Sequence, residues 1–396
     1  MADRPGTIVV TGYPGFIGKR LVHRLAKQAR RERLVLLVLP EFAAAARADL
    51  EARGARDAEV WEGDVVRMHL GLSGTEFRGL LRDTTEIWHL AALSHLDAEP
   101  GAIRRVNVEG TRNVLDLARG AERLARLHHF STAFVSGDRQ GVILEDELEM
   151  GQRFRNAYEE SKARAEVLVR SAMAEVPATV YRPSIVVGDS RTGEIDRFEG
   201  PYYLAILLVT SPLAVPLPLP GDGVAPLNVV PVDYVVSAAL AIGRKAASVG
   251  KTVHLVDPAP FSARRVYEMI AARAHKRLPP VSIPHRLVET VLSLPWLERF
   301  YRQQRAAVES VNHLAFYNPL NELTLLEGTG IRCPPITSYL DRLIAFVKRD
   351  FEKRQQADSE AAVEDPLDGP AAVADAPPGA AGPRRPRAES GGREAP

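Results

Sequence analysis

The first half of the chain alternates between short apolar runs and longer segments with helical spacing. The first run, at 8–10, ends at a glycine-rich turn, after which apolar residues recur at Leu21, Val22 and Leu25. A short apolar run bounded by turn residues is typical of a strand covered on both faces, and the second spacing is typical of a helix. The pattern therefore predicts a strand, a tight turn and a helix.

The same alternation repeats along the chain. Further strands are expected at 34–39, 60–65, 87–92, 128–132 and 179–187. Helical patterns lie between them, among them one that opens at Asn107 and one that carries Tyr158. Strands that alternate with helices predict the α/β class with a doubly wound parallel sheet.

The pattern loosens after residue 188. We expect two more strands, at 227–232 and 253–256, and amphipathic helices at 263–276 and 337–351. Beyond 353 the chain has no aromatic residue and is rich in Ala, Pro, Gly, Asp, Glu and Arg. Such a composition cannot bury enough apolar surface to order itself, so residues 353–396 are predicted to form a disordered tail.

Two apolar segments lie in the second half. Residues 202–220 have the length of a membrane-spanning helix, but four prolines interrupt them. We therefore interpret them as a helix and loop that line an apolar substrate pocket. Residues 286–305 mix apolar residues with arginines, which suits a lid or docking helix. Peripheral contact with a membrane is the alternative for both segments.

Composition narrows the classes of partner and compartment. The net charge of +1 over 396 residues does not favour a nucleic-acid partner, and none is expected. Cys333 is the single cysteine, which excludes a disulfide framework and a cysteine metal site and suits a reducing compartment. The first strand follows Met1 closely, without a signal-peptide pattern, so a cytoplasmic protein is expected. No oligomeric state is predicted.

Two other kinds of site find no support in the sequence. No spacing such as H-E-x-x-H indicates a metal site, so no metal is expected. Ser131 and Ser184 lack the G-x-S-x-G context of a hydrolase nucleophile. Four histidines are interpreted as strand-end or surface residues rather than ligands: His89, His95, His128 and His129.

The turn after the first strand carries three glycines. Gly12 allows the tight turn, Gly15 lets the backbone approach a pyrophosphate, and Gly18 lets the helix pack on the strand. The helix N-terminus adds free N–H groups and the positive end of its dipole. The expected cofactor contacts in this turn are Gly12, Tyr13, Pro14, Gly15, Phe16, Ile17 and Gly18. The spacing differs from G-x-G-x-x-G, so a structural glycine-rich turn is the alternative.

The ends of the next strands supply further candidates for cofactor contact. Leu39 stands where an acid would favour NAD and an arginine NADP, so Arg47 in the following helix is the candidate for a phosphate contact. A solvated helix charge is the alternative for Arg47. Asp64 is placed to accept a hydrogen bond from adenine, with a turn Asp as the alternative. Ala91 and Ala92 are the small residues that a strand needs where a cofactor crosses its tip.

Tyr158 and Lys162 are the strongest catalytic candidates. A spacing of four puts both side chains on one helix face. A free phenol has a pKa near 10, and a nearby ammonium lowers it toward the range useful for acid–base catalysis. Thr132, at the tip of the preceding strand, is placed to donate a hydrogen bond to a carbonyl oxygen. A surface helix pair and a satisfied strand-end hydroxyl are the alternatives.

These residues resemble the extended short-chain dehydrogenase/reductases. The resemblance rests on Thr11-Gly12-x-x-Gly15-Phe16-Ile17-Gly18, on Thr132 and on Tyr158-x-x-x-Lys162. Three further stretches, at 63–73, 107–111 and 181–193, resemble the male sterility-type thioester reductase branch. That branch includes fatty acyl-CoA reductases and the reductase domains of carboxylic acid reductases.

The resemblance implies a domain plan and a set of roles. A Rossmann domain would span 1–200 and receive strands and helices from 227–276, while 200–352 would mainly bind substrate or form a lid. Thr132, Tyr158 and Lys162 would be catalytic, and Lys162 would also contact the cofactor. Further cofactor contacts would be Val65, Asn107, Pro183 and Ser184. NADPH is implied as the donor, with NADH as the alternative because Leu39 stands where this branch usually has an arginine.

The expected function is NAD(P)H-dependent reduction of a carbonyl with a long apolar tail. A fatty acyl thioester on CoA or a carrier is the first candidate substrate, giving an aldehyde and then an alcohol. The alternatives are a hydroxysteroid-like or other alcohol dehydrogenase or ketoreductase, a nucleotide-sugar epimerase, and a non-catalytic dinucleotide-binding protein. The intact catalytic set argues against the last, and the apolar segment 202–220 argues against a sugar nucleotide.

Overall fold

The structure, a computed structural model, describes residues 5–28, 32–55, 57–94, 98–196, 223–275 and 313–363. The chain divides into two compact units, and the first runs from Met1 to Phe351. The elements below belong to this first unit, except that the last helix continues to Val363. The predicted segments 202–220 and 286–305 lie outside the described residues.

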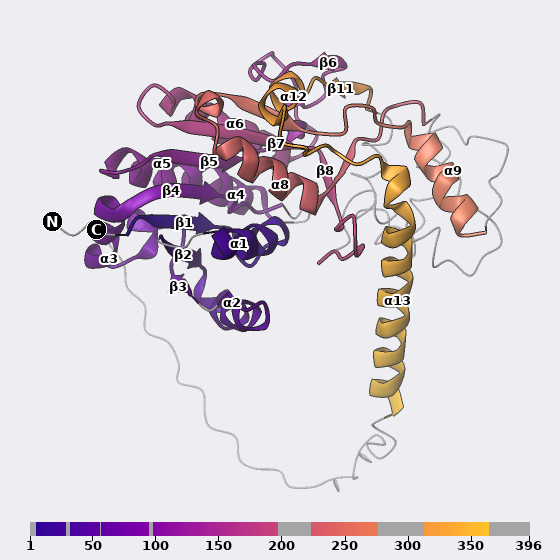
Figure 1. The fold of residues 1–396 in the computed structure, drawn as a ribbon, viewed down its shortest axis with the longest axis horizontal. Helices are drawn as coiled ribbons and strands as arrows, with labels where there is room; N and C mark the ends of the chain where they lie inside the picture. Colours follow the sequence, from indigo (N-terminus) through magenta and orange to yellow (C-terminus); the bar gives the residue numbers. More distant parts are fainter. Residues whose placement is uncertain are drawn as a thin grey trace, which may run out of the picture. The chain divides into compact units, whose positions relative to one another are not determined.

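A seven-stranded parallel sheet forms the centre of the first unit (Figure 1). Its order is β10-β7-β5-β4-β1-β2-β3. The strands are β1 (Thr7–Thr11), β2 (Arg33–Val38), β3 (Ala58–Glu62), β4 (Thr84–His89), β5 (Arg126–Phe130), β7 (Ala178–Pro183) and β10 (Thr252–Leu255). The predicted α/β class with a doubly wound parallel sheet is confirmed.

Helices connect the strands and cover both faces of the sheet. The α-helices are α1 (Phe16–Gln28), α2 (Pro40–Ala52), α3 (Gly74–Asp83), α4 (Pro100–Arg104), α5 (Gly110–Gly120), α6 (Ala157–Ala172), α8 (Val232–Gly243), α9 (Ala263–Arg273), α12 (Leu320–Leu326) and α13 (Leu340–Val363). A π-helical segment, Arg105–Glu109, joins α4 to α5. Short 3₁₀ turns lie at Met68–Gly71, Ala133–Ser136, Ala246–Ser248 and Ile336–Ser338. None of the helices in the described residues is both long and apolar enough to span a bilayer.

The sheet has a hydrophobic core on each of its faces. Successive side chains of a strand point to opposite faces, so neighbouring residues of one strand pack in different cores. Ile8 and Val10 pack with α1, α2, α8 and α12 on one face. Val9 packs with α3, α5 and α6 on the other. Both faces of β1 are thus covered, which explains the unbroken apolar run in its sequence.

Two small parallel sheets flank the main one. β8 (Ile185–Val187) pairs with β9 (Val229–Pro231), and β6 (Gly141–Ile143) pairs with β11 (Ala315–Tyr317). The predicted single strand at 179–187 is therefore wrong, because it divides into β7 and β8. The break follows Pro183, which has no N–H to donate to a ladder. The N–H of Ser184 then bonds to Leu255 O, while that of Ile185 bonds to Asn228 O beside β9.

Several predicted boundaries differ from the observed ones. The strands expected at 60–65, 87–92 and 128–132 end earlier, at Glu62, His89 and Phe130, so the turns that follow are longer than expected. The helix expected at 263–276 ends at Arg273. The helix expected at 337–351 runs instead from Leu340 to Val363, past the predicted start of the tail.

Candidate active site

The carboxyl ends of four neighbouring strands, β7, β5, β4 and β1, meet at one edge of the sheet (Figure 1). Gly12 and Ser184 directly follow the ends of β1 and β7, and Ala91 and Thr132 stand two residues beyond the ends of β4 and β5. The fold thus brings together residues that are far apart in sequence. The strand order changes direction between β1 and β4. In open α/β sheets, ligands bind at such a point of reversal.

The glycine turn is tightly packed against the end of β4. Gly12 has a φ of +84°, and a Cβ there would lie 2.5 Å from the carbonyl carbon of Leu90. A Cβ on Gly15 or Gly18 would lie 2.8 or 2.6 Å from Gly12 O. No acidic residue stands in the first turn of α1. The bare backbone and the helix N-terminus therefore fit the pyrophosphate of a dinucleotide.

The large side chains of this turn have structural contacts. The hydroxyl of Tyr13 donates to Asp49 Oδ2 at 2.6 Å, which joins the turn to α2. Phe16 and Ile17 are partly buried against the two cores beside α1. Among the predicted contacts of the turn, Tyr13 is thus buried and bonded to α2, and Pro14 has no N–H to offer.

A chain of hydrogen bonds joins the turn to β4 and α5. The hydroxyl of Thr111 donates to Asn107 O at 2.6 Å, so it accepts from Nε2 of His89 at 3.0 Å. His89 Nδ1 is then the acceptor for the hydroxyl of Thr11 at 2.8 Å, and that oxygen accepts from the N–H of Ala91. Burial and the charge of Lys162 lower the pKa of His89 to about 3, which keeps the ring neutral.

On the other side of β1, the polar candidates Arg47 and Asp64 already have partners within the described residues. Leu39 caps α2 and is partly exposed. Arg47 Nη2 lies 3.1 Å from Glu62 Oε1, and both side chains are about half exposed. Asp64 Oδ1 accepts from the N–H of Val66 at 2.9 Å, as a turn Asp does. Val65, between them, is buried in the core.

Asn107 is buried in the π-helical segment, and its side chain bonds to two other parts of the chain. Its Oδ1 accepts from the N–H of Leu93 at 2.7 Å, and its Nδ2 donates to Leu93 O at 3.2 Å. The same Nδ2 donates to the hydroxyl of Ser161 at 2.8 Å. Asn107 thus holds the chain that follows Ala91 and Ala92 against α6.

Helix α6 carries Tyr158 and Lys162. Asn156 caps its N-terminus by accepting from the N–H of Glu159 at 2.9 Å. Tyr158 is partly buried in the first turn, whereas Lys162 is almost wholly buried. Lys162 Nζ donates to Phe130 O, the last residue of β5, at 2.5 Å. Burial lowers the pKa of Lys162 to about 8, although the charge of Glu166 acts to raise it.

Thr132 stands two residues beyond Phe130. Its Oγ1 accepts from the N–H of Phe134 at 3.3 Å, which leaves the hydroxyl hydrogen available for donation. Pro183 and Ser184 lie at the neighbouring end of β7, and both are buried. Ser184 Oγ has no hydrogen-bond partner in the part of the chain that the structure describes. An orphaned buried hydroxyl at this edge fits contact with a bound cofactor.

The histidines are buried rather than exposed at the surface. His89, His128 and His129 are at most 1% exposed, and the ring of His128 stacks on Trp88 at 3.6 Å between centroids. The strand-end interpretation holds for His89, the last residue of β4, while His128 and His129 lie within β5 close to its end. None of these three is at the surface, and His95 lies outside the described residues. Within the described ranges, no group of three or more His, Cys, Asp or Glu residues could hold a metal.

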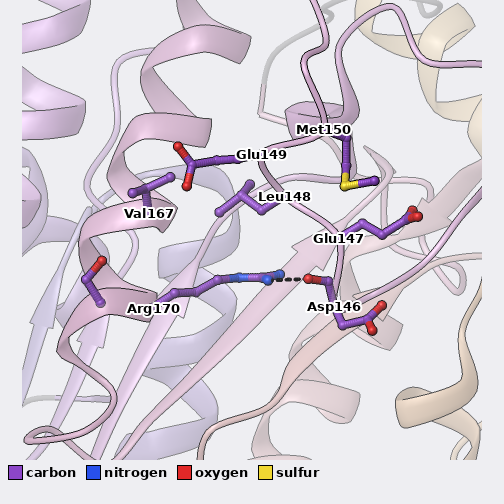
Figure 2. Close-up of a pocket in the computed structure, with 8 residues that line it drawn as sticks. Asp146, Glu147, Leu148, Glu149, Met150, Val167 and Arg170 are labelled. Carbon is purple, nitrogen blue, oxygen red and sulfur yellow. Dashed lines mark hydrogen bonds between the residues drawn. The ribbon is translucent and has the colours of Figure 1, made fainter.

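A pocket of about 450 Å³ lies between α6 and the segment 146–150 (Figure 2). Asp146, Glu147 and Glu149 line it together with Met150, and none of the predicted site residues does. Arg170 forms part of the wall and donates to Asp146 O at 2.7 Å, as the dashed line in Figure 2 marks. This pocket is therefore separate from the catalytic candidates.

Sequence reasoning missed the residues that surround Lys162. Glu166 and Arg182 are completely buried and paired, and Ser131 joins them. The signal was Glu166, four positions after Lys162 and therefore on the same helix face, beside the apolar residue Val169. The partner on β7 could not be read from local sequence.

A family model described as male sterility protein matches residues 10–239, more than half of the chain. The chain belongs to the male sterility protein family. The prediction of an NAD(P)-dependent oxidoreductase of the extended short-chain dehydrogenase/reductase type is confirmed at the level of this family.

Solved structures of similar fold include two reductase domains. The terminal R domain from the myxalamid PKS-NRPS biosynthetic pathway is 29% identical with a TM-score of 0.75, over 89% of this male sterility family member and 92% of that domain. The reductase domain of a nonribosomal peptide synthetase from Mycobacterium tuberculosis is 20% identical with a TM-score of 0.65, over 87% and 94%. At its level of identity, the second shows the fold alone.

Curated relatives of this family member are longer proteins. The fatty acyl-CoA reductase wat of Drosophila melanogaster is 26% identical over 279 residues, which are 59% of this chain and 53% of that protein. The nonribosomal peptide synthetase asaC of Aspergillus flavus is 28% identical over 278 residues, which are 64% and 26%. The chain thus spans about half of the first and about a quarter of the second.

Proposed function

We propose that this male sterility family member reduces an acyl thioester to an aldehyde and a thiol, with NADPH as the donor. The observation that carries the proposal is the buried ammonium of Lys162, one helical turn after Tyr158, at the sheet edge that also holds Thr132 and the glycine turn. When bound, the nicotinamide supplies a hydride. The residues of the chain would bind the cofactor, orient the substrate and transfer protons.

The cofactor would lie across the carboxyl ends of the strands. Gly12, Gly15 and Gly18 would hold the pyrophosphate at the N-terminus of α1, and Asp64 and Val65 would lie beside the adenine. Ala91 and Ala92, Asn107, and Pro183 with Ser184 would line the remaining path. Arg47 would contact the ribose phosphate of NADPH, which requires that it leave Glu62.

Thr132 would orient the substrate carbonyl. Its oxygen accepts from the N–H of Phe134, which leaves the hydroxyl hydrogen to donate to an acceptor at the strand end. A hydrogen bond there stabilises negative charge that develops on the carbonyl oxygen. Tyr158 would donate a second hydrogen bond, and then a proton, to the same oxygen.

Lys162 would tune Tyr158 and hold the cofactor. One of its three donors goes to Phe130 O, which leaves two for the ribose and the phenol. An ammonium close to a phenol favours the phenolate and lowers the pKa of the phenol. Lys162 would thereby ease the transfer of the Tyr158 proton to the carbonyl oxygen.

Support for a thioester substrate comes from the relatives. They include a fatty acyl-CoA reductase and the reductase domains of peptide synthetases. The myxalamid R domain matches over nearly its whole length. Reduction of a thioester with release of thiol gives an aldehyde, and a second reduction would give the alcohol.

A ketoreductase or alcohol dehydrogenase would use the same three residues and is the second candidate function. A nucleotide-sugar epimerase is ranked last. The UDP-glucuronic acid 4-epimerase of Bacillus cereus, solved with NAD, has a TM-score of 0.61 at 18% identity, which shows the fold alone. It therefore does not favour that substrate here.

The test measures NADPH and NADH oxidation with palmitoyl-CoA, free aldehydes and ketones as substrates. We expect thioester-dependent oxidation, and a loss of at least about 10²-fold in kcat/KM for Tyr158→Phe. Tyr267→Phe is the matched control, since the hydroxyl of Tyr267 is buried on α9 without a partner in the described residues. A wild type that oxidises NADPH with ketones but not with thioesters would reject the thioester proposal in favour of the second candidate.

A further inference from the structure

Two side chains of α6, one turn apart, hold two consecutive residues at the end of β5. Lys162 Nζ donates to Phe130 O at 2.5 Å. The hydroxyl of Ser131, the next residue, donates to Glu166 Oε2 at 2.6 Å. Because Thr132 follows Ser131 directly, these two bonds fix the position of the chain just before Thr132.

Glu166 lies at the centre of a buried cluster of charges. Arg182 from β7 reaches both of its oxygens, with Nη2 at 2.7 Å from Oε1 and Nε at 3.0 Å from Oε2. Arg170 Nε lies 2.9 Å from Oε1. Burial alone would raise the pKa of Glu166, but the two guanidiniums and the hydroxyl of Ser131 hold it below its usual range. The carboxylate is therefore charged.

The outer members of the cluster are themselves anchored. Arg182 Nη2 also donates to Glu147 O at 2.8 Å. Arg170 donates to Asp146 O at 2.7 Å, as Figure 2 shows, and to Glu145 O at 2.8 Å. Its Nε donates to Glu166, so the guanidinium joins the pocket wall to the buried carboxylate. The position of Glu166 is thus set by β7 and by the segment 145–147 as well as by its own helix.

Among the described residues, Lys162 interacts electrostatically with Glu166, His89 and His129. Glu166 lies on the same helix, His89 faces it from β4 and His129 from β5. The partly buried Tyr158 stands one turn earlier on α6. Burial and the charge of Lys162 lower the pKa values of both histidines, so both are neutral near pH 7. Among these groups, Glu166 is the one that carries a negative charge.

We infer that Glu166 is a positioning residue of the active site, which fixes the end of β5 through Ser131 and keeps Lys162 in its ammonium form. This inference rests on the proposed function for the roles of Thr132 and Lys162. A carboxylate serves both tasks, since an apolar residue would neither accept from Ser131 nor stabilise a buried cation.

The charge effect is tested on the protein without substrate. Lysine labelled with ¹³C at Cε is titrated by NMR, and the Lys162 signal is assigned from its absence in Lys162→Met. We expect Glu166→Gln to lower the pKa of Lys162 by about one unit, because the ammonium loses its counter-charge. Glu160→Gln removes an acid from the partly exposed face of the same helix, where it pairs with Arg164, and should leave that pKa unchanged.

The positional effect is tested by Ser131→Ala, which removes the bond and keeps the charge. We expect an unchanged pKa of Lys162, a fall of about tenfold in kcat and an unchanged KM for NADPH, with Ser131→Thr restoring part of the rate. If Glu166→Gln fails to fold, Ser131→Ala still tests whether the bond to Glu166 positions the end of β5. A wild-type kcat in Ser131→Ala, or a wild-type pKa in a folded Glu166→Gln, overturns the inference.

The two tests separate this inference from the proposed function. The NMR titration requires no turnover, so an enzyme inactive on thioesters still shows whether Glu166 sets the pKa of Lys162. The rate measurement uses whichever carbonyl the wild type reduces.

Discussion

Single positions at the sheet edge are constrained by the space around the backbone. Gly12 combines a φ of +84° with backbone atoms of Leu90 and Ala91 that a Cβ would approach to 2.5–2.6 Å. Gly54, after α2, has a similar φ of +67°, but a Cβ there would meet nothing within 4 Å. Comparing Gly12 with Gly54 therefore separates the cost of a left-handed backbone conformation from the cost of steric crowding around a Cβ.

We expect Gly12→Ala to lower the free energy of unfolding by at least about 2 kcal/mol and to abolish NADPH binding, because crowding adds to backbone strain. Gly54→Ala should lose only about 1 kcal/mol and bind NADPH as the wild type does. Urea denaturation and fluorescence titration measure the two quantities. Equal losses in the two variants would show that crowding by β4 is unimportant.

At the scale of elements, side-chain hydrogen bonds rather than the ladder alone hold the strand tips in register. The chain from Ala91 through Thr11, His89 and Thr111 to Asn107 ties the β1 turn to β4 and to the helix beyond it. Every donor in it has one acceptor, which requires His89 to carry its proton on Nε2. The side chains in the middle of this chain, those of Thr11, His89 and Thr111, thus position the strand tips without being among the proposed cofactor contacts.

Thr111→Val keeps the shape of this side chain but removes the acceptor for His89 Nε2. We expect a loss of about 1–3 kcal/mol in the free energy of unfolding, since a buried N–H is left without a partner. Thr111→Ser keeps the hydroxyl and should lose much less. Urea denaturation gives both values, and ¹⁵N NMR of the wild type at pH 6 should show His89 protonated on Nε2 alone. A ring protonated on Nδ1 would contradict the proposed direction of the chain.

At the scale of the whole molecule, the sequence predicted those features of the fold that depend on residues close together in the chain. The apolar run of β1 and the glycine turn were predictable because each is decided within a few positions. The pairing of Glu166 with Arg182 was not, because it requires β7 to lie beside β5 and α6 to cover both. The exit of the chain after Pro183 was missed because Ile185 and Val187 continue an apolar pattern while they pair with another sheet. The roles of the site residues stay predictions.

Buried acids also set how the stability of the whole molecule depends on pH. Glu322 on α12 accepts from the N–H of Val256 at 3.1 Å and from the hydroxyl of Tyr234. Burial raises the pKa of Glu322 to about 7, against the effect of these bonds. The folded state therefore binds a proton that the unfolded state releases between about pH 4.5 and 7, so this group's contribution is present below pH 4.5 and is lost as the pH rises through 7.

We expect the wild type to lose about 2–3 kcal/mol relative to Glu322→Gln as the pH rises from 4.5 to 7.5. The difference between the two proteins isolates Glu322 from His89 and His254, whose lowered pKa values act in the opposite direction. Urea denaturation at four pH values measures it. A constant difference across that range would mean that the pKa of Glu322 is the same in the folded and the unfolded protein.

The parallel pairing of β6 with β11 joins residues near 142 to residues near 316. Ala133, next to Thr132, packs in the same small cluster as Ala315 and Tyr317. During synthesis on the ribosome, the strands of the large sheet would all have emerged before this last support is made. The loop that begins at Thr132 would therefore reach its final form only when nearly the whole of the first compact unit has left the exit tunnel, so an incomplete chain would already have its dinucleotide-binding edge while lacking this support.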